Sequence, residues 1–271
     1  MDSLSVAVAQ APVEAGNVPA NAATAVRLLE EAAAGGAQLA VFPELFLGGY
    51  DLPGMAADPR PYGVTPDGNV LRELAGACRR LGIAAVIGAS VPHAGGWANG
   101  AIVLDHHGRH VATYNKIQLW ATERAVFTPG DRYVMFGLHG FRIGVLICYD
   151  AGFPEHARAL ALAGADVVVC PSAFARGEEE RRYHLYFPQR ALENTVFVAV
   201  ANAVGDQGGL AMFGRSSVFG PRGTLLCAAG SGREVAVARL DRQALLSARR
   251  DLPYLSDLRW DIPRPTLEEG D

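Results

Sequence analysis

Paired cysteines and clustered metal-ligating residues are scarce in this chain. The 271 residues include only four cysteines, and these are widely separated: Cys78, Cys148, Cys170 and Cys227. Because no CxxC pair occurs, a structural zinc site and a dithiol redox motif are both disfavoured. Isolated cysteines in a chain of this length are typical of a reducing compartment. We therefore expect a cytoplasmic protein that needs no metal and no cofactor.

The chain also lacks an excess of positive charge and a long apolar run. A formal net charge of −4 and an isoelectric point near 6.0 provide no basic stripe for nucleic acid. Residues 1–8 lack the basic segment of a signal peptide and alternate as a strand does. The uncharged stretch at residues 82–104 is interrupted by Pro92, Gly95 and Asn99, which argues against a membrane span. We expect neither a nucleic-acid partner nor a membrane partner.

What the chain does contain is enough apolar sequence for a large core, since 50% of its residues are hydrophobic and 19% are charged. Apolar periodicity predicts strands at residues 4–9, 38–42, 83–89, 99–105, 109–114, 141–148, 166–170, 196–202, 216–219, 224–227 and 234–240. It predicts helices ending near residue 34 and spanning residues 68–81, 153–164, 178–194 and 241–249. This order indicates an α/β fold, either two packed sheets with helices outside or a single mixed sheet.

One domain over residues 1–271 is expected, because no linker or low-complexity block interrupts the chain. The tail from about residue 251 has no clear pattern, and we expect it to be extended or to lie at a dimer contact. Asn17 or Asn21 is expected to cap the first helix, and Pro188 to start or kink its helix. Residues 47–68 are expected to form a surface loop, and the alternative is a loop that covers a site.

Cys148 occupies the most informative position in the sequence. It ends an apolar strand that begins at Phe141 and is followed by Tyr149, Asp150 and a helix that opens at Pro154. The carboxyl ends of strands in open α/β sheets are where ligands bind, and a nearby helix N-terminus favours a thiolate. The alternative interpretation is a packing residue, since cysteines in apolar strands are most often buried and inert.

Glu44 and Lys116 follow strand ends in the same way. Glu44 lies among apolar neighbours, where desolvation raises the pKa of a carboxyl group toward that of a useful general base. A thiol nucleophile needs such a base, and the oxyanion that it forms needs a donor such as an ammonium group. The alternatives are a carboxylate in a surface loop and a solvated lysine.

Two other groups compete for a functional interpretation. Cys170 also ends a strand, but Pro171 follows it and removes a backbone N–H that an oxyanion hole would use. We therefore rank Cys170 below Cys148 as a nucleophile. His106 and His107 are adjacent, but their position before Gly108 favours an exposed hairpin turn over a metal site.

Three ordered motifs resemble those of the nitrilase, or carbon–nitrogen hydrolase, superfamily: Phe42-Pro43-Glu44, Tyr114-Asn115-Lys116-Ile117-Gln118-Leu119 and Ile147-Cys148-Tyr149-Asp150. Weaker matches extend the resemblance over nearly the whole chain. It implies a four-layer α-β-β-α sandwich, commonly paired as a homodimer. It also implies that Glu44 is the base, Lys116 the oxyanion stabiliser and Cys148 the nucleophile. By the same resemblance, Glu123 positions the substrate or assists proton transfer, and the backbone N–H of Tyr149 completes the oxyanion hole.

The resemblance implies an amidase that converts a small, aliphatic carboxamide to a carboxylate and ammonia through a cysteine thioester. Asn115 and Gln118 depart from the family pattern, which usually has a basic residue and a histidine at these positions, but neither change affects the triad. A nitrilase or an N-carbamoyl amidohydrolase would use the same triad. An inactive small-molecule-binding or scaffold homologue and a zinc hydrolase are the alternatives from other classes.

Aromatic residues near the motifs are candidates for contact with the amide substrate. We expect the pocket to be lined by Phe46, Tyr50, Trp120, Phe174 and Tyr183, with Tyr149 beside the nucleophile. Plain core packing is the alternative interpretation for each ring. Their bulk favours a small acyl group.

Overall fold

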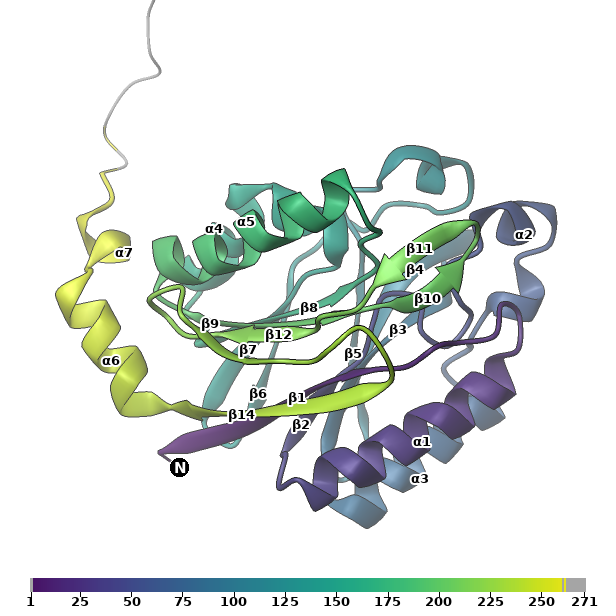
Figure 1. Ribbon diagram of the computed structural model, residues 1–271, viewed down its shortest axis with the longest axis horizontal. Helices are drawn as coiled ribbons and strands as arrows, with labels where there is room; N and C mark the ends of the chain where they lie inside the picture. Colours follow the sequence, from purple (N-terminus) through teal and green to yellow (C-terminus); the bar gives the residue numbers. More distant parts are fainter. Residues whose placement is uncertain (1, 260, 262–271) are drawn as a thin grey trace, which may run out of the picture.

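Two six-stranded sheets pack face to face in the computed structural model of the chain, which describes residues 2–259 and 261 (Figure 1). The strands of the first sheet, in spatial order, are β14 (Glu234–Asp241), β1 (Ser3–Gln10), β2 (Leu39–Val41), β3 (Ala84–His93), β4 (Gly96–Leu104) and β5 (His110–Asn115). Those of the second sheet are β13 (Leu225–Ala228), β12 (Ser217–Phe219), β9 (Phe197–Asn202), β8 (Val167–Ser172), β7 (Phe141–Val145) and β6 (Val134–Leu138).

Each sheet has a parallel centre and antiparallel edges. Strands β1, β2 and β3 run parallel, as do β7, β8 and β9. The remaining neighbours within the two sheets pair antiparallel. Parallel neighbours need long crossover connections, which here are the helices that cover the outer faces.

Helices form the two outer layers. Figure 1 shows α1 (Val18–Ala34) and α3 (Asn69–Leu81) on the first sheet, and α4 (Pro154–Leu162) and α5 (Glu178–Asn194) on the second. The shorter helices are α2 (Leu52–Ala57), α6 (Arg242–Asp251) and α7 (Tyr254–Asp257). This arrangement confirms the expected α-β-β-α sandwich and decides against a single mixed sheet. None of the helices in the described part of the chain combines the length and the apolar character needed to span a bilayer.

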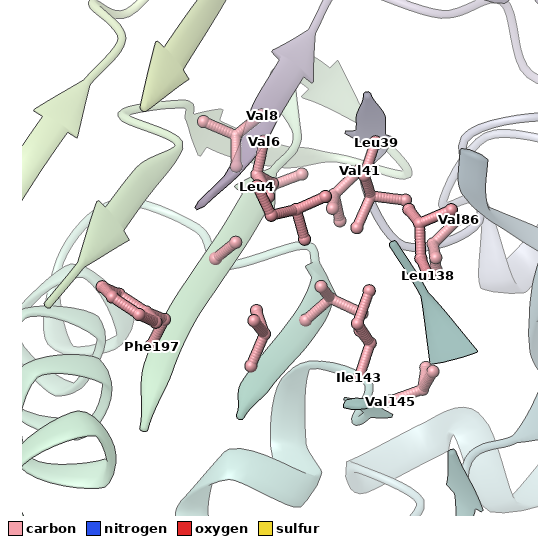
Figure 2. Close-up of a cluster of buried hydrophobic side chains, with 14 of the residues drawn as sticks. Leu4, Val6, Val8, Leu39, Val41, Val86, Leu138, Ile143, Val145 and Phe197 are labelled. Atoms are coloured by element: carbon pink, nitrogen blue, oxygen red, sulfur yellow. The ribbon is translucent and has the colours of Figure 1, made fainter. Parts of the chain in front are cut away.

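The alternation of side chains explains why the strands are apolar on both faces. In β1, Leu4, Val6 and Val8 point into the core between the sheets, whereas Ala7 and Ala9 pack against the outer helices. Figure 2 shows the inner core, where the β1 side chains meet residues of the second sheet such as Ile143. Every strand in the centre of this sandwich is therefore buried on two sides, as the continuous apolar runs predict.

The first helix is capped by Asn17 and not by Asn21. The Asn17 side chain accepts a hydrogen bond from the backbone N–H of Ala20 at 3.3 Å. Asn21 lies inside the helix, where its Nδ2 donates to the carbonyl of Leu47 at 2.9 Å. It thus ties α1 to the segment that follows Glu44.

The prediction was wrong about the length of one hairpin. Strands β3 and β4 continue past the expected ends and meet at a tight turn, where Ala94 and Gly95 have φ values of 48° and 78°. Pro92 and Gly96 indicated a loop here, but both lie in the ladder as the pair Pro92–Trp97 and the pair His93–Gly96. The long hairpin places Asn99 opposite Ser90, deep in the first sheet.

Other local predictions also need correction. Residues 47–68 are not a plain loop, because they contain α2, capped by Asp51, and the 3₁₀-helix η1 (Arg60–Tyr62). Strand β7 ends at Val145, three residues before the expected end, and β6 was not predicted. A separate two-stranded hairpin, β10 (Val204–Gln207) and β11 (Leu210–Phe213), was also missed. Short strands with mixed polarity give weak periodic signals.

Pro188 does not start its helix, since it lies inside α5, which is continuous from Glu178 to Asn194. Burial of Tyr183, Phe187 and Ala191 on its inner face offsets the one missing backbone hydrogen bond. The expectation for the tail falls mostly outside the described residues, which end with α7 and the short segment after it.

Candidate active site

Glu44 lies where the carboxyl ends of the two sheets meet. It follows β2, and its backbone N–H donates to the carbonyl of Ser172, at the end of β8, at 3.3 Å. Gly88 of β3 makes room for this turn, because a Cβ atom there would lie 2.1 Å from the carbonyl oxygen of Pro43. The residue is only 1% exposed, and its side chain is fully buried. A residue from the first sheet is thereby placed against the second.

Lys116 is fully buried beside two carboxylates. It directly follows β5, and its backbone N–H donates to the carbonyl of Asn99 at 2.8 Å, which continues the ladder by one rung. Its Nζ donates to Glu44 Oε1 at 2.6 Å and to Glu123 Oε1 at 2.8 Å. Because an ammonium group has three N–H donors, one remains for another acceptor.

Glu123 anchors this ion cluster to the surrounding chain. It lies in the 3₁₀-helix η2 (Ala121–Ala125) and is fully buried. The hydroxyl of Tyr50 donates to its Oε1 at 2.8 Å, and the backbone N–H of Trp120 donates to its Oε2 at 2.8 Å. The same carboxylate therefore fixes the ammonium group of Lys116, the side chain of Tyr50 and the backbone of Trp120.

Cys148 begins the 3₁₀-helix η3 (Cys148–Gly152) in a strained conformation. Its φ of 45° lies in the left-handed region, which costs a residue with a Cβ atom free energy and often marks a nucleophile on a sharp turn. Tyr149 follows in the first turn, where backbone N–H groups have no acceptor within the helix. The turn thus presents a thiol and a backbone donor together.

Asp150 holds the turn that begins at Cys148 in place. Its buried carboxylate accepts hydrogen bonds from the Tyr114 hydroxyl at 2.7 Å, the Gln118 backbone N–H at 2.8 Å and the Ile147 backbone N–H at 3.1 Å. Tyr114 and Gln118 flank Lys116 in the sequence. Asp150 therefore links the turn that carries the thiol to the segment that carries the ammonium group.

The surroundings of Glu44 favour the protonated, neutral form of its carboxyl group. Burial raises the pKa of Glu44 from 4.5 to about 7, although Lys116 opposes this shift. Burial alone would lower the pKa of Lys116, but Glu123 and Glu44 outweigh it and hold the pKa well above the usual range. Burial and then Glu44 raise the pKa of the Cys148 thiol, while Lys116 and the backbone of Ala173 lower it. The carboxyl group of Glu44 and the thiol of Cys148 therefore affect each other's proton affinity.

A hollow of about 320 Å³, counted with its open mouth, leads to Cys148. Its lining includes four of the six expected contact residues, Tyr50, Trp120, Tyr149 and Phe174. Phe46 and Tyr183 do not line it, contrary to the expectation. Phe46 packs against Phe42 under the outer helices, and the Tyr183 hydroxyl donates to the carbonyl of Arg215 at 2.7 Å.

The competing groups lie elsewhere. Cys170 is completely buried, and burial raises the pKa of its thiol to about 12. His106 and His107 lie in the turn between β4 and β5. Across residues 2–259 and 261, no three histidine, cysteine or acidic side chains gather as a metal site would require.

Known proteins share this sequence and arrangement. The sequence profile of the carbon-nitrogen hydrolase family matches residues 5–250. The chain belongs to the carbon-nitrogen hydrolase family. An (R)-stereoselective amidase from a Pseudomonas species is 36% identical over 245 residues, which cover 88% of this chain and 85% of the relative. A nitrilase from Pyrococcus abyssi is 34% identical over 251 residues, which cover 92% of each chain.

Solved structures of this carbon-nitrogen hydrolase family share the fold. A mutant amidase from Nesterenkonia sp. AN1 is similar with a TM-score of 0.82 and 31% identity, over 95% of this chain and 98% of that one. That protein carries the acetamide moiety of fluoroacetamide, covalently added to its active-site cysteine. Another mutant of the same amidase, in complex with butyramide, also has a TM-score of 0.82 at 31% identity, over 93% of this chain and 97% of that one.

Sequence reasoning missed several residues of this carbon-nitrogen hydrolase site. Asn99 donates to the carboxylates of both glutamates, yet it lies mid-strand, where nothing local marks it. Glu179, Arg182 and Tyr186 line the hollow from one face of α5. Their spacing of three and four residues predicts a shared helix face, but only the packing of α5 shows that this face borders the hollow.

Proposed function

We propose that this protein is an amidase that hydrolyses the C–N bond of a small carboxamide through a thioester on Cys148. The observation that carries this proposal is the ion pair of Lys116 and Glu44, with Nζ 2.6 Å from Oε1. Both groups act electrostatically on the Cys148 thiol, which lines the hollow. The cluster supplies a base, an oxyanion donor and a nucleophile without a histidine.

In the first half of the reaction, Glu44 takes the proton of Cys148 and the sulfur attacks the carbonyl carbon. The N–H of Lys116 that neither carboxylate uses and the backbone N–H of Tyr149 hold the oxyanion. Oxyanion donors of this kind are typically worth about 3 kcal/mol each in the transition state. The C–N bond then breaks, the nitrogen takes the proton from Glu44, and ammonia leaves.

In the second half, water replaces ammonia in the site. Glu44 removes a proton from the water, whose oxygen attacks the thioester carbonyl, and the same two donors hold the second oxyanion. The C–S bond breaks, the proton on Glu44 returns to the sulfur, and the carboxylic acid leaves and gives its proton to the solvent as it becomes the carboxylate. Glu123 keeps the ammonium group of Lys116 in place throughout, since it holds Nζ at 2.8 Å.

The relatives support an amide as the substrate. The Pseudomonas relative is named an (R)-stereoselective amidase, and the Nesterenkonia amidase has been solved with butyramide and with an acetamide moiety on its cysteine. The apolar rings of Tyr50, Trp120 and Phe174 in the walls of the hollow suit a small, largely apolar acyl group.

The test is ammonia release from a panel of short aliphatic amides, together with intact-protein mass spectrometry after brief mixing. We expect wild-type protein to release ammonia and to show an added acyl mass on the peptide that contains Cys148. Cys148→Ala should show neither, whereas Cys170→Ala should retain both. Ammonia release by Cys148→Ala would exclude the proposed nucleophile.

A nitrile is the second candidate substrate, because the Pyrococcus abyssi relative is named a nitrilase. The same thiol would add to the nitrile carbon, and water would complete the hydrolysis. A matched panel of butyramide and butyronitrile separates the two. Faster turnover of the nitrile would make the protein a nitrilase.

We also propose that the protein acts in the cytoplasm as a homodimer. Its four cysteines are all free thiols, which suits a reducing compartment. Exposed leucines such as Leu185 on α5 and Leu225 on β13 offer apolar surface for a second copy. Light scattering at micromolar concentration tests the dimer, and a monomeric mass would contradict it.

A further inference from the structure

Asn99 lies between the two buried glutamates of the site. Its Nδ2 donates to Glu44 Oε1 at 2.7 Å and lies 3.4 Å from Glu123 Oε1. Its backbone carbonyl accepts the N–H of Lys116 at 2.8 Å. The residue is 1% exposed and contacts every charged member of the cluster without lining the hollow.

We propose that Asn99 is a positioning residue that decides which oxygen of Glu44 exchanges the proton with Cys148. Oε1 of Glu44 accepts from both Asn99 Nδ2 and Lys116 Nζ, at 2.7 and 2.6 Å. Oε2 is buried and has no partner within hydrogen-bonding distance among the described residues. Because Oε1 is occupied by two donors, the free lone pairs of Oε2 are left for the proton. This inference rests on the proposed function of Glu44 as the base.

The orientation of the Asn99 amide follows from its neighbours. Ionised carboxylates only accept hydrogen bonds, so the NH₂ group and not the oxygen must face Glu44 and Glu123. The amide oxygen, Oδ1, then points away and is buried without a partner in the described part of the chain. An unpaired buried oxygen destabilises a fold, and an apolar side chain of similar size would avoid it. An asparagine at this position therefore lowers the stability of the fold but provides hydrogen bonds to the two glutamates of the site.

The consequence for Glu44 has a definite sign. The charged and titratable groups that face its carboxylate are Lys116, Glu123 and the Cys148 thiol, and Tyr50 reaches the cluster through Glu123. Asn99 adds a donor that stabilises the ionised form of Glu44. Removing that donor should make Glu44 harder to ionise, and should also let its carboxylate rotate away from the thiol.

The test compares Asn99→Leu with Asn99→Asp, which are both close to asparagine in size. For Asn99→Leu we expect kcat for a small amide to fall by about 100-fold, with KM within about twofold, because ground-state binding in the hollow is unchanged. The acid limb of kcat/KM should move upward by about one pH unit. The thermal midpoint should stay equal or rise, because the unpaired Oδ1 is gone.

Asn99→Asp keeps the shape but places a third carboxylate against Glu44, so its activity should fall further than that of Asn99→Leu. This variant also tests the proposed role of Asn99 if Asn99→Leu does not fold. Wild-type turnover by Asn99→Asp would overturn the proposal.

Ser90→Ala is the matched control. Ser90 is the direct ladder partner of Asn99 on β3, is 1% exposed, and has a hydroxyl oxygen without a hydrogen-bond partner in the described residues. Removing this hydroxyl changes the same rung of the sheet without a contact to either glutamate, so kcat and the acid limb should stay as in wild type. Equal losses in Ser90→Ala and Asn99→Leu, or an unmoved acid limb in Asn99→Leu, would show that Asn99 acts only on the fold.

A readout without an amide substrate separates this inference from the proposed function. The rate of Cys148 alkylation by iodoacetamide, followed by peptide mass against pH, should rise as Glu44 ionises and accepts the thiol proton. In Asn99→Leu this rise should occur at higher pH. If wild-type protein hydrolyses no amide but the alkylation profile still moves, the proposed function fails and the role of Asn99 stands. If amides are hydrolysed and the profile does not move, the role of Asn99 fails alone.

Discussion

Lys116 Nζ lies 2.6 Å from Glu44 Oε1, and both side chains are completely out of contact with solvent. The two residues are 72 positions apart in the chain. Lys116 is the only lysine in the sequence, and the chain otherwise uses arginine. A compact ammonium group can bind two carboxylates and still offer a third N–H from a single atom, whereas the donors of a guanidinium group are spread over a larger, rigid plane.

Replacing that ammonium group should affect both activity and stability. For Lys116→Met we expect kcat to fall by about 100-fold to 1,000-fold, since one oxyanion donor is lost. The free energy of unfolding should fall by about 3–5 kcal/mol at neutral pH, because two buried carboxylates lose their counter-charge. Steady-state kinetics and urea unfolding measure the two effects. Full stability at neutral pH would show that the carboxylates do not depend on Lys116.

Activity should depend on pH through the carboxyl group of Glu44. The base must be ionised to accept the thiol proton, and burial raises the pKa of Glu44 to about 7. The value of kcat/KM should therefore rise with pH and reach half of its plateau near pH 7. Since burial holds the pKa of Cys148 above its usual value, the plateau should extend into the alkaline range. An acid limb below pH 5 would contradict the assignment of Glu44 as the base.

The free energy of unfolding should also depend on pH through the carboxyl group of Glu44. It should fall as pH rises, whereas activity should increase. The pKa of Glu44 rises on folding from 4.5 to about 7, so the folded protein binds this proton more tightly than the unfolded chain. The resulting stabilisation is complete below pH 4.5 and is lost as pH rises through 7, by about 3 kcal/mol. Glu44→Gln cannot titrate and provides the comparison. Parallel pH profiles of unfolding free energy for the two proteins would disprove the raised pKa.

Arg182 should tune the response to charge on the substrate. It lies on the wall of the hollow, its side chain is 39% exposed, and its Nη2 is 3.6 Å from Glu179 Oε1, too far for a strong hydrogen bond. Its guanidinium group can therefore bind an anionic group on an amide. For Arg182→Gln we expect KM for an amide that carries a carboxylate to rise about tenfold, with butyramide changed less than about twofold.

Arg181→Gln is the control for this measurement. Arg181 neighbours Arg182 on α5 but is exposed and does not line the hollow. Its replacement removes the same charge from the same helix, so it should change neither KM. An equal rise in both variants would mean that the net charge of the helix acts at long range and not through contact.

Much of the fold was predictable because it is encoded locally. Alternating apolar residues identified most strands of both sheets, and Asn17 was one of two candidates for the first cap. The long β3–β4 hairpin was not predictable in the same way, because Pro92 and Gly96 indicate a turn unless neighbouring strands pair with them. Whether such residues lie in a turn or in a strand depends on the pairing of strands within the sandwich.

The residues of the candidate site also differ in whether local sequence reveals them. Glu44, Lys116 and Cys148 were predicted as the reactive groups because each follows a strand end within a recognisable motif. Asn99 and Arg182 carry no motif, since one lies mid-strand and the other on an ordinary helix face. Their relation to the site exists only through segments that approach from elsewhere in the chain.

The amino-acid sequence alone predicted most strands and helices in their order, the three candidate reactive groups and the family. Only the tertiary structure decided that Glu44 keeps one oxygen free and that its pKa lies near 7. It also decided that α5 forms a wall of the hollow. The reason is physical, because motifs and periodicity arise from neighbours along the chain. The pKa of a group and the shape of a pocket arise from desolvation and from charges that the fold brings together across many residues.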